Sequence, residues 1–433
     1  MPWRFAALIH PPRLIHFFMK IFRTLLSIIT ALPLVAAEPK PPASVSLEAL
    51  VAQAFAENPE LKFYEAEIAA TKGERKTAGA WANPEITGEV GRKRVRGDVT
   101  AEGTAWAVSV QQTFEWPGRI SLRKAIADRQ VQLAEAGFDQ FRAALAAEVR
   151  RRGFALFTAQ RRAEAAREVA GRGEDLVATL VQREPAGVTP LLETRAIEAS
   201  VIKLRRGATE AVKEAQSALY QLNQLRGLPI QMPLAIADVA LNFADLPGVE
   251  ELIRQAARGN FTLRQREIEL AQQGFKVKLS ENEAWPSITV GPQFSQEKAG
   301  DKETRAGVGV SLPLPLWNRN AGNVEAARAR ELQAQTSLRL AQREIERKLR
   351  EQAAAYELQR KEMERWNPKV AEQLREAAAL ADRHYRLGAV PLATYLEVQS
   401  SYLEALEAIY ATQSDALNAL SEIELLTGSK LTK

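Results

Sequence analysis

The chain has 433 residues and no cysteine, and its 58 basic residues outnumber its 53 acidic ones. The missing cysteine excludes disulfides, thiolate zinc sites and a thiol nucleophile, and leads us to expect no lipid-anchored N-terminus. Four basic residues and no acidic residue lie before residue 38, so the remainder holds 54 basic and 53 acidic residues. A nearly neutral chain gives no electrostatic reason to expect a nucleic acid partner.

Residues 1–37 have the order of a secretory signal peptide, with a basic segment, an apolar run and a small-residue cleavage site. These features are Lys20 and Arg23, Leu25–Val35, and Val35-Ala36-Ala37. We expect the mature chain to begin at Glu38, and Met19 competes with Met1 as the start codon. The alternative is a retained membrane anchor, but the apolar run is shorter than the roughly 20 residues that a membrane-spanning helix needs.

From residue 38 onward, the second half of the chain repeats the first at a distance of about 200 residues. The matched segments are Ala80–Ile86 with Ala284–Ile288, Trp116–Arg119 with Leu316–Arg319, and Gly187–Leu191 with Gly388–Leu392. A fixed period is typical of repeat architectures. The sequence therefore predicts a first repeat over 38–230, a linker over 231–247 and a second repeat over 248–433.

Alternating residues predict two β-strands in each repeat. The expected strands are 84–95 and 104–115, then 286–297 and 305–316. Val108 and Val110, for example, alternate with Ala107, Ser109 and Gln111. An apolar face opposite a small or polar face over about ten residues is typical of a membrane β-strand. A soluble hairpin with one buried face has the same pattern. Polar residues predict that the loops 96–103 and 298–304 join the strands directly.

The rest of each repeat is predicted to be a long helical hairpin. No proline interrupts 118–184 or 316–367, and both intervals are rich in residues that favour helix. The first interval could span about 100 Å as a helix. Turns rich in glycine and proline place the hairpin tips near 187 and 388. Leucine or tyrosine recurs every seven residues from 396 to 417, which indicates coiled-coil packing.

Four strands in one chain leave two open sheet edges, and open edges are not tolerated in the hydrocarbon of a membrane. The smallest membrane barrels have eight strands. If these strands lie in a membrane, the chain must therefore associate with further copies, so that two chains supply eight strands or three supply twelve. The predicted fold class is mainly α, with a membrane β-barrel portion.

The passages from strand to helix carry five residues whose chemistry suits a sharp bend or a membrane rim. We expect Pro117 in the first turn of a helix, where its missing N–H is not needed. Gly118 and Gly322 would permit the chain to bend. Arg119 and Arg319 would lie near the rim of the barrel, where a salt bridge or a lipid headgroup is a better partner than transported material.

The signal peptide, the two tandem repeats and the strand and helix pattern together resemble the TolC-type outer membrane factor family. The resemblance covers essentially all of residues 44–428. Within that family, the strand–helix passages Phe114–Arg119 and Pro313–Gly322 are most similar to the CzcC-like branch of heavy-metal RND efflux systems.

The resemblance implies a homotrimer with a twelve-stranded β-barrel in the outer membrane and a twelve-helix α-barrel in the periplasm. It further implies that the chain is the exit duct of a tripartite system, with a periplasmic adaptor protein and an RND inner membrane pump as partners and outer membrane lipid around the barrel. Heavy-metal cations are the expected cargo. Drugs and secreted peptides are alternatives, and the sequence does not decide whether the gate is open or closed at rest.

The hairpin tips are the expected docking points for the adaptor, because they end the helices farthest from the strands. The residues are Gly187, Arg386, Leu387 and Gly388. In resembling proteins an acidic ring narrows the periplasmic entrance at this level. The candidate gate residues here are Glu397, Glu193, Thr394 and Leu392. Each of the two carboxylates could instead be an ordinary surface group.

The sequence offers little catalytic material, and we expect no enzyme, no cofactor and no bound metal. The expected mature chain has one histidine, His384, between arginines and suited to a solvated role. Phosphate-binding and hydrolase motifs are absent from the sequence. Two rival interpretations are a periplasmic adaptor, which would have a single hairpin flanked by compact β-domains, and a secreted helical hydrolase or binding protein, which would need a polar pocket.

Overall fold

Residues 44–97, 100–183, 191–239, 241, 243–366 and 369–431 are described by a computed structural model of the chain. The expected signal peptide, 1–37, and the expected tip residue Gly187 lie outside these residues. The elements of the first half are α1 (Leu47–Glu57), α2 (Pro59–Ala78), β1 (Glu85–Val95), β2 (Ala101–Phe114), α3 (Arg119–Arg183) and α4 (Leu191–Leu225). Those of the second half are α5 (Val249–Gly259), α6 (Phe261–Asn282), β3 (Ile288–Ala299), β4 (Asp301–Ser311), α7 (Ala321–Glu364), α8 (Val370–Arg386) and α9 (Leu392–Thr427).

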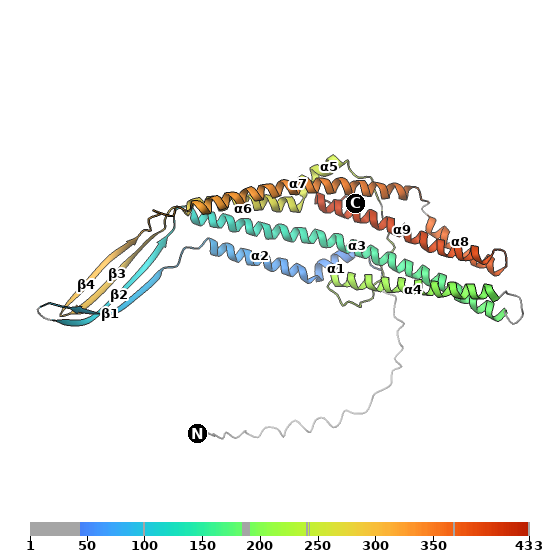
Figure 1. The fold of residues 1–433 in the computed structure, drawn as a ribbon, viewed down its shortest axis with the longest axis horizontal. Coiled ribbons are helices and arrows are strands. Elements are labelled where there is room, and N and C mark those ends of the chain that lie inside the picture. Colours follow the sequence, from blue (N-terminus) through green and yellow to red (C-terminus); the bar gives the residue numbers. More distant parts are fainter. Residues whose placement is uncertain are drawn as a thin grey trace, which may run out of the picture. The chain divides into compact units, whose positions relative to one another are not determined.

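The four described strands form one antiparallel sheet in the order β1-β2-β3-β4 (Figure 1). Opposed residues of antiparallel strands share a face, and the register sets Val108 opposite Phe294 and Val290 opposite Val310. That face carries Ile86, Val90, Trp106, Val108, Val110, Phe114, Ile288, Val290, Phe294, Val308 and Val310. The other face carries Thr87, Glu89, Ala105, Ala107, Ser109, Gln293, Ser295, Gly307 and Gly309. Over these stretches the sheet is therefore apolar on one face and small or polar on the other, as the alternation predicts. Toward the β1–β2 turn the first face becomes polar, with Arg92, Arg94, Glu102 and Thr104.

The strand ends differ from those predicted. Both hairpins are tighter, since Val95 pairs with Ala101 and Ala299 pairs with Asp301. Gly300 alone separates β3 from β4, with a positive φ of 85° that suits a residue without a side chain. The last strand was expected to reach residue 316 but ends at Ser311. Prolines at 313 and 315 follow it, and proline has no N–H to donate to a sheet.

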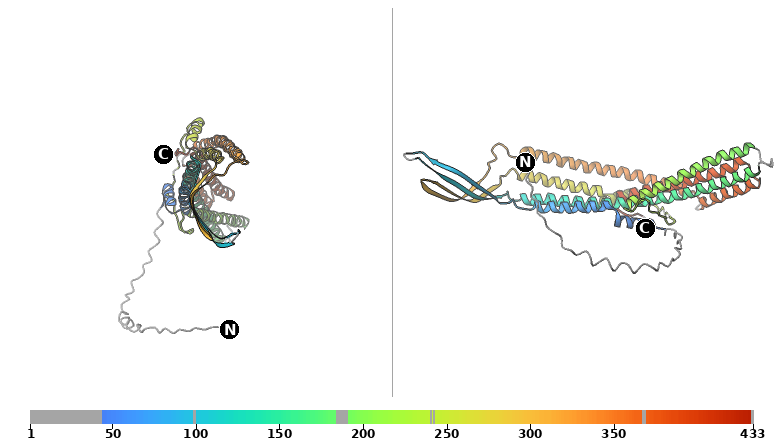
Figure 2. Two further views of the ribbon diagram at one scale, coloured as in Figure 1. Left: turned by 90° about the vertical axis from the view of Figure 1, so that its left-hand side faces the viewer. Right: turned by 90° about the horizontal axis from the view of Figure 1, so that it is seen from below.

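The helix α3 is the longest described element and packs against α1, α2, α4, α6 and α9. It packs against α2 and α6 over the part nearer the sheet, and against α4 and α9 farther along (Figure 1). In the second half, α7 packs against α6 and α9, and α8 packs against α9. Figure 2 shows these helices from two further directions, with the sheet at one end of the bundle and the α3–α4 and α8–α9 ends at the other.

The outgoing helix of the second half is interrupted, although the sequence predicted a rod comparable with α3. The helix α7 ends at Glu364 and α8 begins at Val370. The N–H groups of Arg365 and Trp366 donate to carbonyls three residues back, at 3.2 and 3.1 Å, which is how a helix tightens at its end. In the first half, α3 continues without a break from Arg119 to Arg183.

The short helix pairs α1–α2 and α5–α6 anchor the returning helices in the same way in both halves. The Nδ2 of Asn58 donates to the carbonyl of Leu225 at the end of α4, at 2.8 Å. The Nδ2 of Asn260 donates to the carbonyl of Leu426 at the end of α9, also at 2.8 Å. Each asparagine also caps the helix that follows it. Asn58 and Asn260 stand at matching places in the repeat, so the duplication in sequence is also a duplication of contacts.

Glycine is required where these anchors form. Gly227 and Gly428 end α4 and α9 with positive φ values of 68° and 67°. A Cβ at Gly227 would lie 2.3 Å from the carbonyl oxygen of Glu57, and one at Gly428 would lie 2.1 Å from that of Gly259. Any side chain would therefore be strained and would also collide with the backbone of the neighbouring helix.

Candidate functional site

The passage from β2 to α3 is a tight turn rather than the start of the helix. The N–H of Arg119 donates to the carbonyl of Trp116 at 3.1 Å, and Gly118 has a φ of +90°. Proline and then glycine at the two central positions is the pattern of a type II turn. The expectation that Pro117 lies in the first turn of the helix is therefore wrong, because α3 begins two residues later at Arg119.

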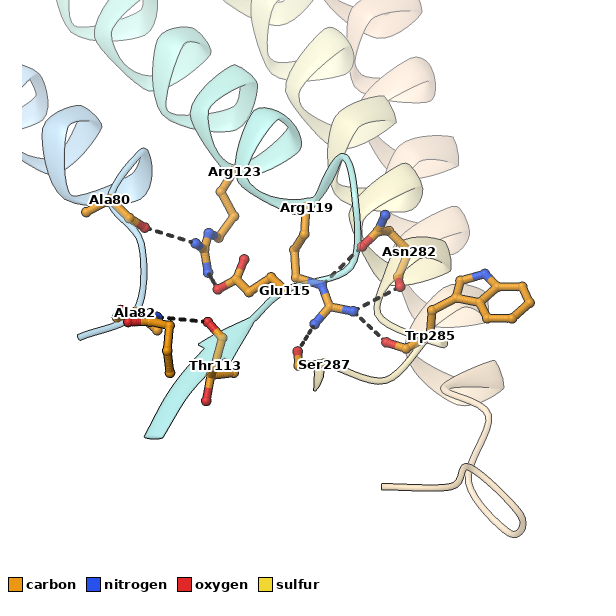
Figure 3. Close-up of polar contacts among 10 residues, drawn as sticks. Ala80, Ala82, Thr113, Glu115, Arg119, Arg123, Asn282, Trp285 and Ser287 are labelled. Atoms are coloured by element: carbon orange, nitrogen blue, oxygen red, sulfur yellow. Dashed lines mark hydrogen bonds and ion pairs between the residues drawn. The ribbon is translucent and has the colours of Figure 1, made fainter. Parts of the chain in front are cut away.

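Arg119 links the two halves of the chain through neutral acceptors (Figure 3). Its guanidinium donates to the Oδ1 of Asn282 at 3.0 Å and to the Oγ of Ser287 at 2.9 Å. It also donates to the carbonyls of Asn282 and Trp285 at 3.0 and 2.7 Å. In return, the Nδ2 of Asn282 donates to the carbonyl of Pro117 at 2.9 Å. The expected rim salt bridge of Arg119 is not formed among the described residues; the side chain ties β2 and α3 to α6 and β3 instead.

Aromatic and charged contacts surround this arginine. The rings of Trp116 and Trp285 stack with their centroids 4.9 Å apart. The carboxylate of Glu115 accepts from Arg123 at 2.7 Å (Figure 3). We call the group formed by Trp116, Pro117, Gly118 and Arg119 with Asn282, Trp285 and Ser287 the central joint. It holds the first half against the second at the point where strands pass into helices.

The passage from β4 to α7 is built differently and meets none of these partners within the described chain. The positive φ, 64°, falls on Asn320, and the N–H of Asn320 donates to the Oδ1 of Asn318 at 2.9 Å. Asparagine tolerates this conformation better than most residues. Gly322 was expected to provide the bend, but it lies inside the first turn of α7. Arg319 and Trp317 are exposed to solvent.

The second hairpin tip is a well-defined helix end. The N–H groups of Gly388 and Ala389 donate to the carbonyls of Tyr385 and His384, both at 2.9 Å, and Gly388 has a φ of +72°. This is the bonding pattern of a Schellman motif, for which glycine is preferred. His384 is exposed. Leu387 is 75% exposed, so the tip presents an apolar side chain to solvent.

The third expected tip residue, Arg386, is held by the body of the hairpins. Its Nε donates to the Oδ2 of Asp382 at 2.9 Å, and its guanidinium reaches the carbonyl of Arg172 on α3 at 3.4 Å. The hydrogen bond to Asp382 raises the pKa of Arg386, and burial opposes this shift in part. Arg386 therefore helps to fix α8 against α3 rather than projecting freely from the tip.

The four candidate gate residues have different surroundings. Glu193 on α4 accepts a hydrogen bond from the hydroxyl of Tyr385 on α8 at 2.9 Å. Leu392 packs into an apolar cluster with the buried Tyr395. Thr394 and Glu397 are exposed on α9. The structure thus brings Glu193 into a link between the hairpins and leaves Glu397 and Thr394 accessible.

This link between the hairpins was not predicted from the sequence. The Tyr385 and Tyr395 rings stack with their centroids 5.4 Å apart. Burial and the neighbouring Glu193 carboxylate raise the pKa of Tyr385, so its hydroxyl stays protonated and can donate. Burial raises the pKa of Tyr395 to about 12. Tyrosines at 385 and 395 face each other only because the chain reverses at Gly388, and no local pattern identifies such a pair.

A second set of contacts that the sequence did not predict joins α3 to α8 in the same interface. Glu168 on α3 accepts from Arg172 on the same helix and from Arg375 on α8, the latter at 3.1 Å. The Glu168–Arg172 spacing of four residues is a recognisable helix pair. The partner Arg375 lies 207 positions away and could not be identified from spacing.

Two features sought for transport chemistry do not occur in the described part of the chain. Over those residues, no three His, Cys, Asp or Glu side chains gather in a way that could hold a metal ion. None of the helices described here has the length and apolar character needed to cross a membrane.

Comparison with known proteins identifies a family. The family described as outer membrane efflux protein matches residues 50–228 and again residues 252–429. The cobalt-zinc-cadmium resistance protein CzcC of Cupriavidus metallidurans is 26% identical over 290 residues, which are 65% of this chain. The match spans 66% of that relative, just under two thirds of its length.

Solved structures share the fold. A membrane protein from Pseudomonas aeruginosa superposes with a TM-score of 0.72 at 20% identity, covering 91% of this chain and 97% of that one. The CmeC outer membrane channel of Campylobacter jejuni superposes with a TM-score of 0.70 at 15% identity, covering 92% of each chain. The fold is therefore shared with a known outer membrane channel.

Proposed function

The chain belongs to the outer membrane efflux protein family, and from this premise we propose that it is an outer membrane channel that passively conducts substrate out of the cell. In the proposal, three chains close a twelve-stranded barrel, and their helices form a twelve-helix tunnel in the periplasm. The two halves of the chain supply equivalent parts of both.

The observation that carries this proposal is the two-faced sheet. Its apolar face is largely exposed, and its other face is small or polar. Both β1 and β4 are edge strands in the described sheet. A surface of this kind is stable where lipid covers the apolar face, water covers the polar face, and further copies pair with the two edges.

The first test is the size of the assembly. Protein extracted from outer membranes in mild detergent should have about three times the mass of one chain, because four strands cannot close a barrel alone and the proposed barrel has twelve. Light scattering coupled to size exclusion measures this mass. A stable, fully folded monomer in detergent and in lipid would contradict the proposal.

The helical ends opposite the sheet are proposed to meet a periplasmic adaptor protein, which in turn engages an RND inner membrane pump. The exposed Leu387 and the Schellman turn at Gly388 give the second tip a fixed shape and an apolar side chain. Gly187 is proposed for the same role in the first hairpin. Arg386 then acts by positioning α8, since its guanidinium is already bonded within the chain.

We expect Leu387→Cys to crosslink to the adaptor in intact cells, because the tip is exposed and the chain has no other cysteine. A thiol-reactive crosslinker and a blot for the adaptor measure the product. Leu332→Cys is the matched control: this leucine is also exposed, but it lies on α7 near the sheet. Crosslinking at 332 and not at 387 would mean that the orientation is reversed.

The periplasmic entrance is proposed to be narrowed by Glu397, with the contact between Glu193 and Tyr385 restraining α4 and α8. Three exposed Glu397 carboxylates near a narrow opening would attract cations. Thr394 precedes Glu397 by three residues and shares its side of α9. Leu392 supports the entrance through its apolar contacts.

Glu397→Ala should raise single-channel conductance in planar bilayers or lower the preference for cations, because it removes three negative charges from the ring. Block by divalent cations from the periplasmic side should weaken. The matched control is Glu404→Ala, which removes an exposed carboxylate two turns farther along α9. Equal effects of the two substitutions would place the constriction elsewhere.

The proposed cargo is heavy-metal cations, supported by the similarity to a cobalt-zinc-cadmium resistance protein. Drug efflux and type I secretion are the alternatives on the same fold. Deleting the gene should increase sensitivity to cobalt, zinc and cadmium without changing sensitivity to hydrophobic drugs. The adaptor alternative is disfavoured, because such a protein would have a single hairpin, whereas helical hairpins occur in both halves of this chain.

A further inference from the structure

One of the most exposed large side chains in the described structure lies at the passage from β4 to α7. Trp317 is 94% exposed, and Arg319 beside it is exposed as well. At the other edge of the sheet, Trp81 between α2 and β1 is 63% exposed. Trp81 packs edge-on against Phe114 within the chain, with ring centroids 6.0 Å apart, but both tryptophans remain largely exposed to solvent at the two edges of one sheet.

The chain already contains the contact that these residues lack. In the central joint, Trp116 follows β2 and stacks on Trp285, which precedes β3. In the sequence repeat, Trp81 matches Trp285, and the segment Trp116–Arg119 matches Leu316–Arg319, which contains Trp317. Trp81 is therefore the counterpart of Trp285, whereas Trp317 stands one position after Leu316, the counterpart of Trp116.

From this duplication we infer that a second copy of the chain completes an outer joint, in which Trp317 of one chain packs against Trp81 of the next. The inference rests on the proposed assembly but concerns the chemistry of its contact rather than the number of copies. Arg319 takes the part of Arg119 and donates to main-chain carbonyls at the end of the neighbour's α2, at Ala78 and Trp81. Asn83 of the neighbour offers the side-chain acceptor that Ser287 offers in the central joint.

The second turn differs from the first in its positive-φ residue, Asn320 instead of Gly118, and in where its tryptophan and arginine stand. Arg119 is the first residue of α3, whereas Arg319 precedes α7 by two residues. The guanidinium of Arg319 thus approaches the neighbour from just outside the helix. A hydrogen bond from an arginine to a backbone carbonyl requires only that the guanidinium reach the carbonyl oxygen. The shift of Arg319 to a position before the helix therefore preserves the contact.

The sheet edges support the same partner. The outward apolar residues of the edge strands are more exposed than those of the inner strands: Val90 is 90% and Val308 is 68% exposed, against 42% for Val108. Within the sheet, Val108 lies opposite Phe294. In the repeat, Val308 is the counterpart of Val108, and Val90 is the counterpart of Phe294. The same register between chains would therefore set Val308 of one chain opposite Val90 of the next.

Two single-cysteine variants with different tags test the outer joint when they are expressed together. Trp81→Cys in one chain and Trp317→Cys in the other should be joined by a short thiol-to-thiol reagent into a product that carries both tags. The pair Trp116→Cys and Trp285→Cys in one chain calibrates the reagent, because those rings are stacked. Phe63→Cys with Trp317→Cys is the control: Phe63 is exposed on α2 but lies 15 residues before the end of that helix at Ala78, about 22 Å along it.

We expect at least tenfold more mixed product from the 81–317 pair than from the 63–317 pair. A second pair leaves every tryptophan in place: Val90→Cys with Val308→Cys should form a disulfide between chains, and Ile86→Cys with Val308→Cys should not, because it is four residues out of register.

The possible failures separate the joint from the assembly. If the chains form oligomers and the calibration pair reacts, but neither the 81–317 pair nor the 90–308 pair does, the joint is wrong and the proposed function stands. If the chains do not associate at all, the proposed function fails with it. A fluorophore attached to the thiol of the Trp317→Cys variant could be quenched by brominated lipid while no crosslink to residue 81 forms. That result would show that lipid covers this site and would overturn the joint.

Discussion

Val310→Arg is expected to prevent the chain from assembling in the outer membrane. Val310 lies on the apolar face of β4 in line with Ala306 and Val308, and apolar residues continue at 312 and 314, beyond the end of the strand at Ser311. An arginine on the lipid side of a membrane barrel costs about 2–4 kcal/mol at mid-bilayer. Three chains would each carry that cost, so the assembled form should be strongly disfavoured.

The matched control is Ser311→Arg, which places the same side chain on the adjacent residue. Ser311 pairs with Thr289 on the polar face of the sheet, where an arginine would meet water. The amount of heat-resistant oligomer in outer membrane fractions should fall at least tenfold for Val310→Arg and by less than half for Ser311→Arg. Equal losses from both substitutions would mean that the two faces of the sheet are not lipid and water.

The features that could be predicted from the sequence are those that depend on a local period. The alternation of Val108 and Val110 with Ala107 and Ser109 gives the faces of the sheet, because side chains of a strand alternate by geometry alone. The absence of proline over 118–184 gives the extent of α3, which runs to Arg183. Such patterns require no knowledge of what lies across the interface.

Boundaries and bends were less predictable, because several residue types can satisfy the same backbone requirement. Gly322 was the natural candidate for the bend before α7, but Asn320 adopts the positive φ there and Gly322 continues the helix. Pro117 suits a first helical turn, yet followed by Gly118 it also suits a type II turn, and the structure has the turn. Local sequence left both solutions open.

The sequence pattern did not predict the contacts between the two halves of the chain. Tyr385 was not singled out, and Glu193 was proposed only as a gate carboxylate, yet the two residues meet across the hairpins. Arg119 was expected to form a rim salt bridge or to meet a lipid headgroup, and instead binds carbonyl and amide oxygens of the second half. The signal that could have indicated this contact is the repeat itself, since matching halves that share one sheet must meet at matching ends.

Arg119→Ala is the second substitution with a large expected effect, because one side chain makes four hydrogen bonds that hold the halves together. Hydrogen bonds to a charged group contribute about 1.5–3 kcal/mol, and removing the donor leaves the carbonyls of Asn282 and Trp285 without it. We expect the free energy of unfolding in detergent to fall by about 3 kcal/mol. Denaturant titration followed by circular dichroism measures this change.

Two variants show whether the loss comes from the joint. Arg119→Lys keeps the charge but not the planar fork that reaches several acceptors at once, so it should recover less than half of the stability. Arg254→Ala removes an arginine from an exposed pair with Glu251 on α5 and should change the free energy of unfolding by less than about 1 kcal/mol. If Arg119→Ala is no worse than Arg254→Ala, the central joint does not hold the halves together, and the outer joint inferred from it loses its template.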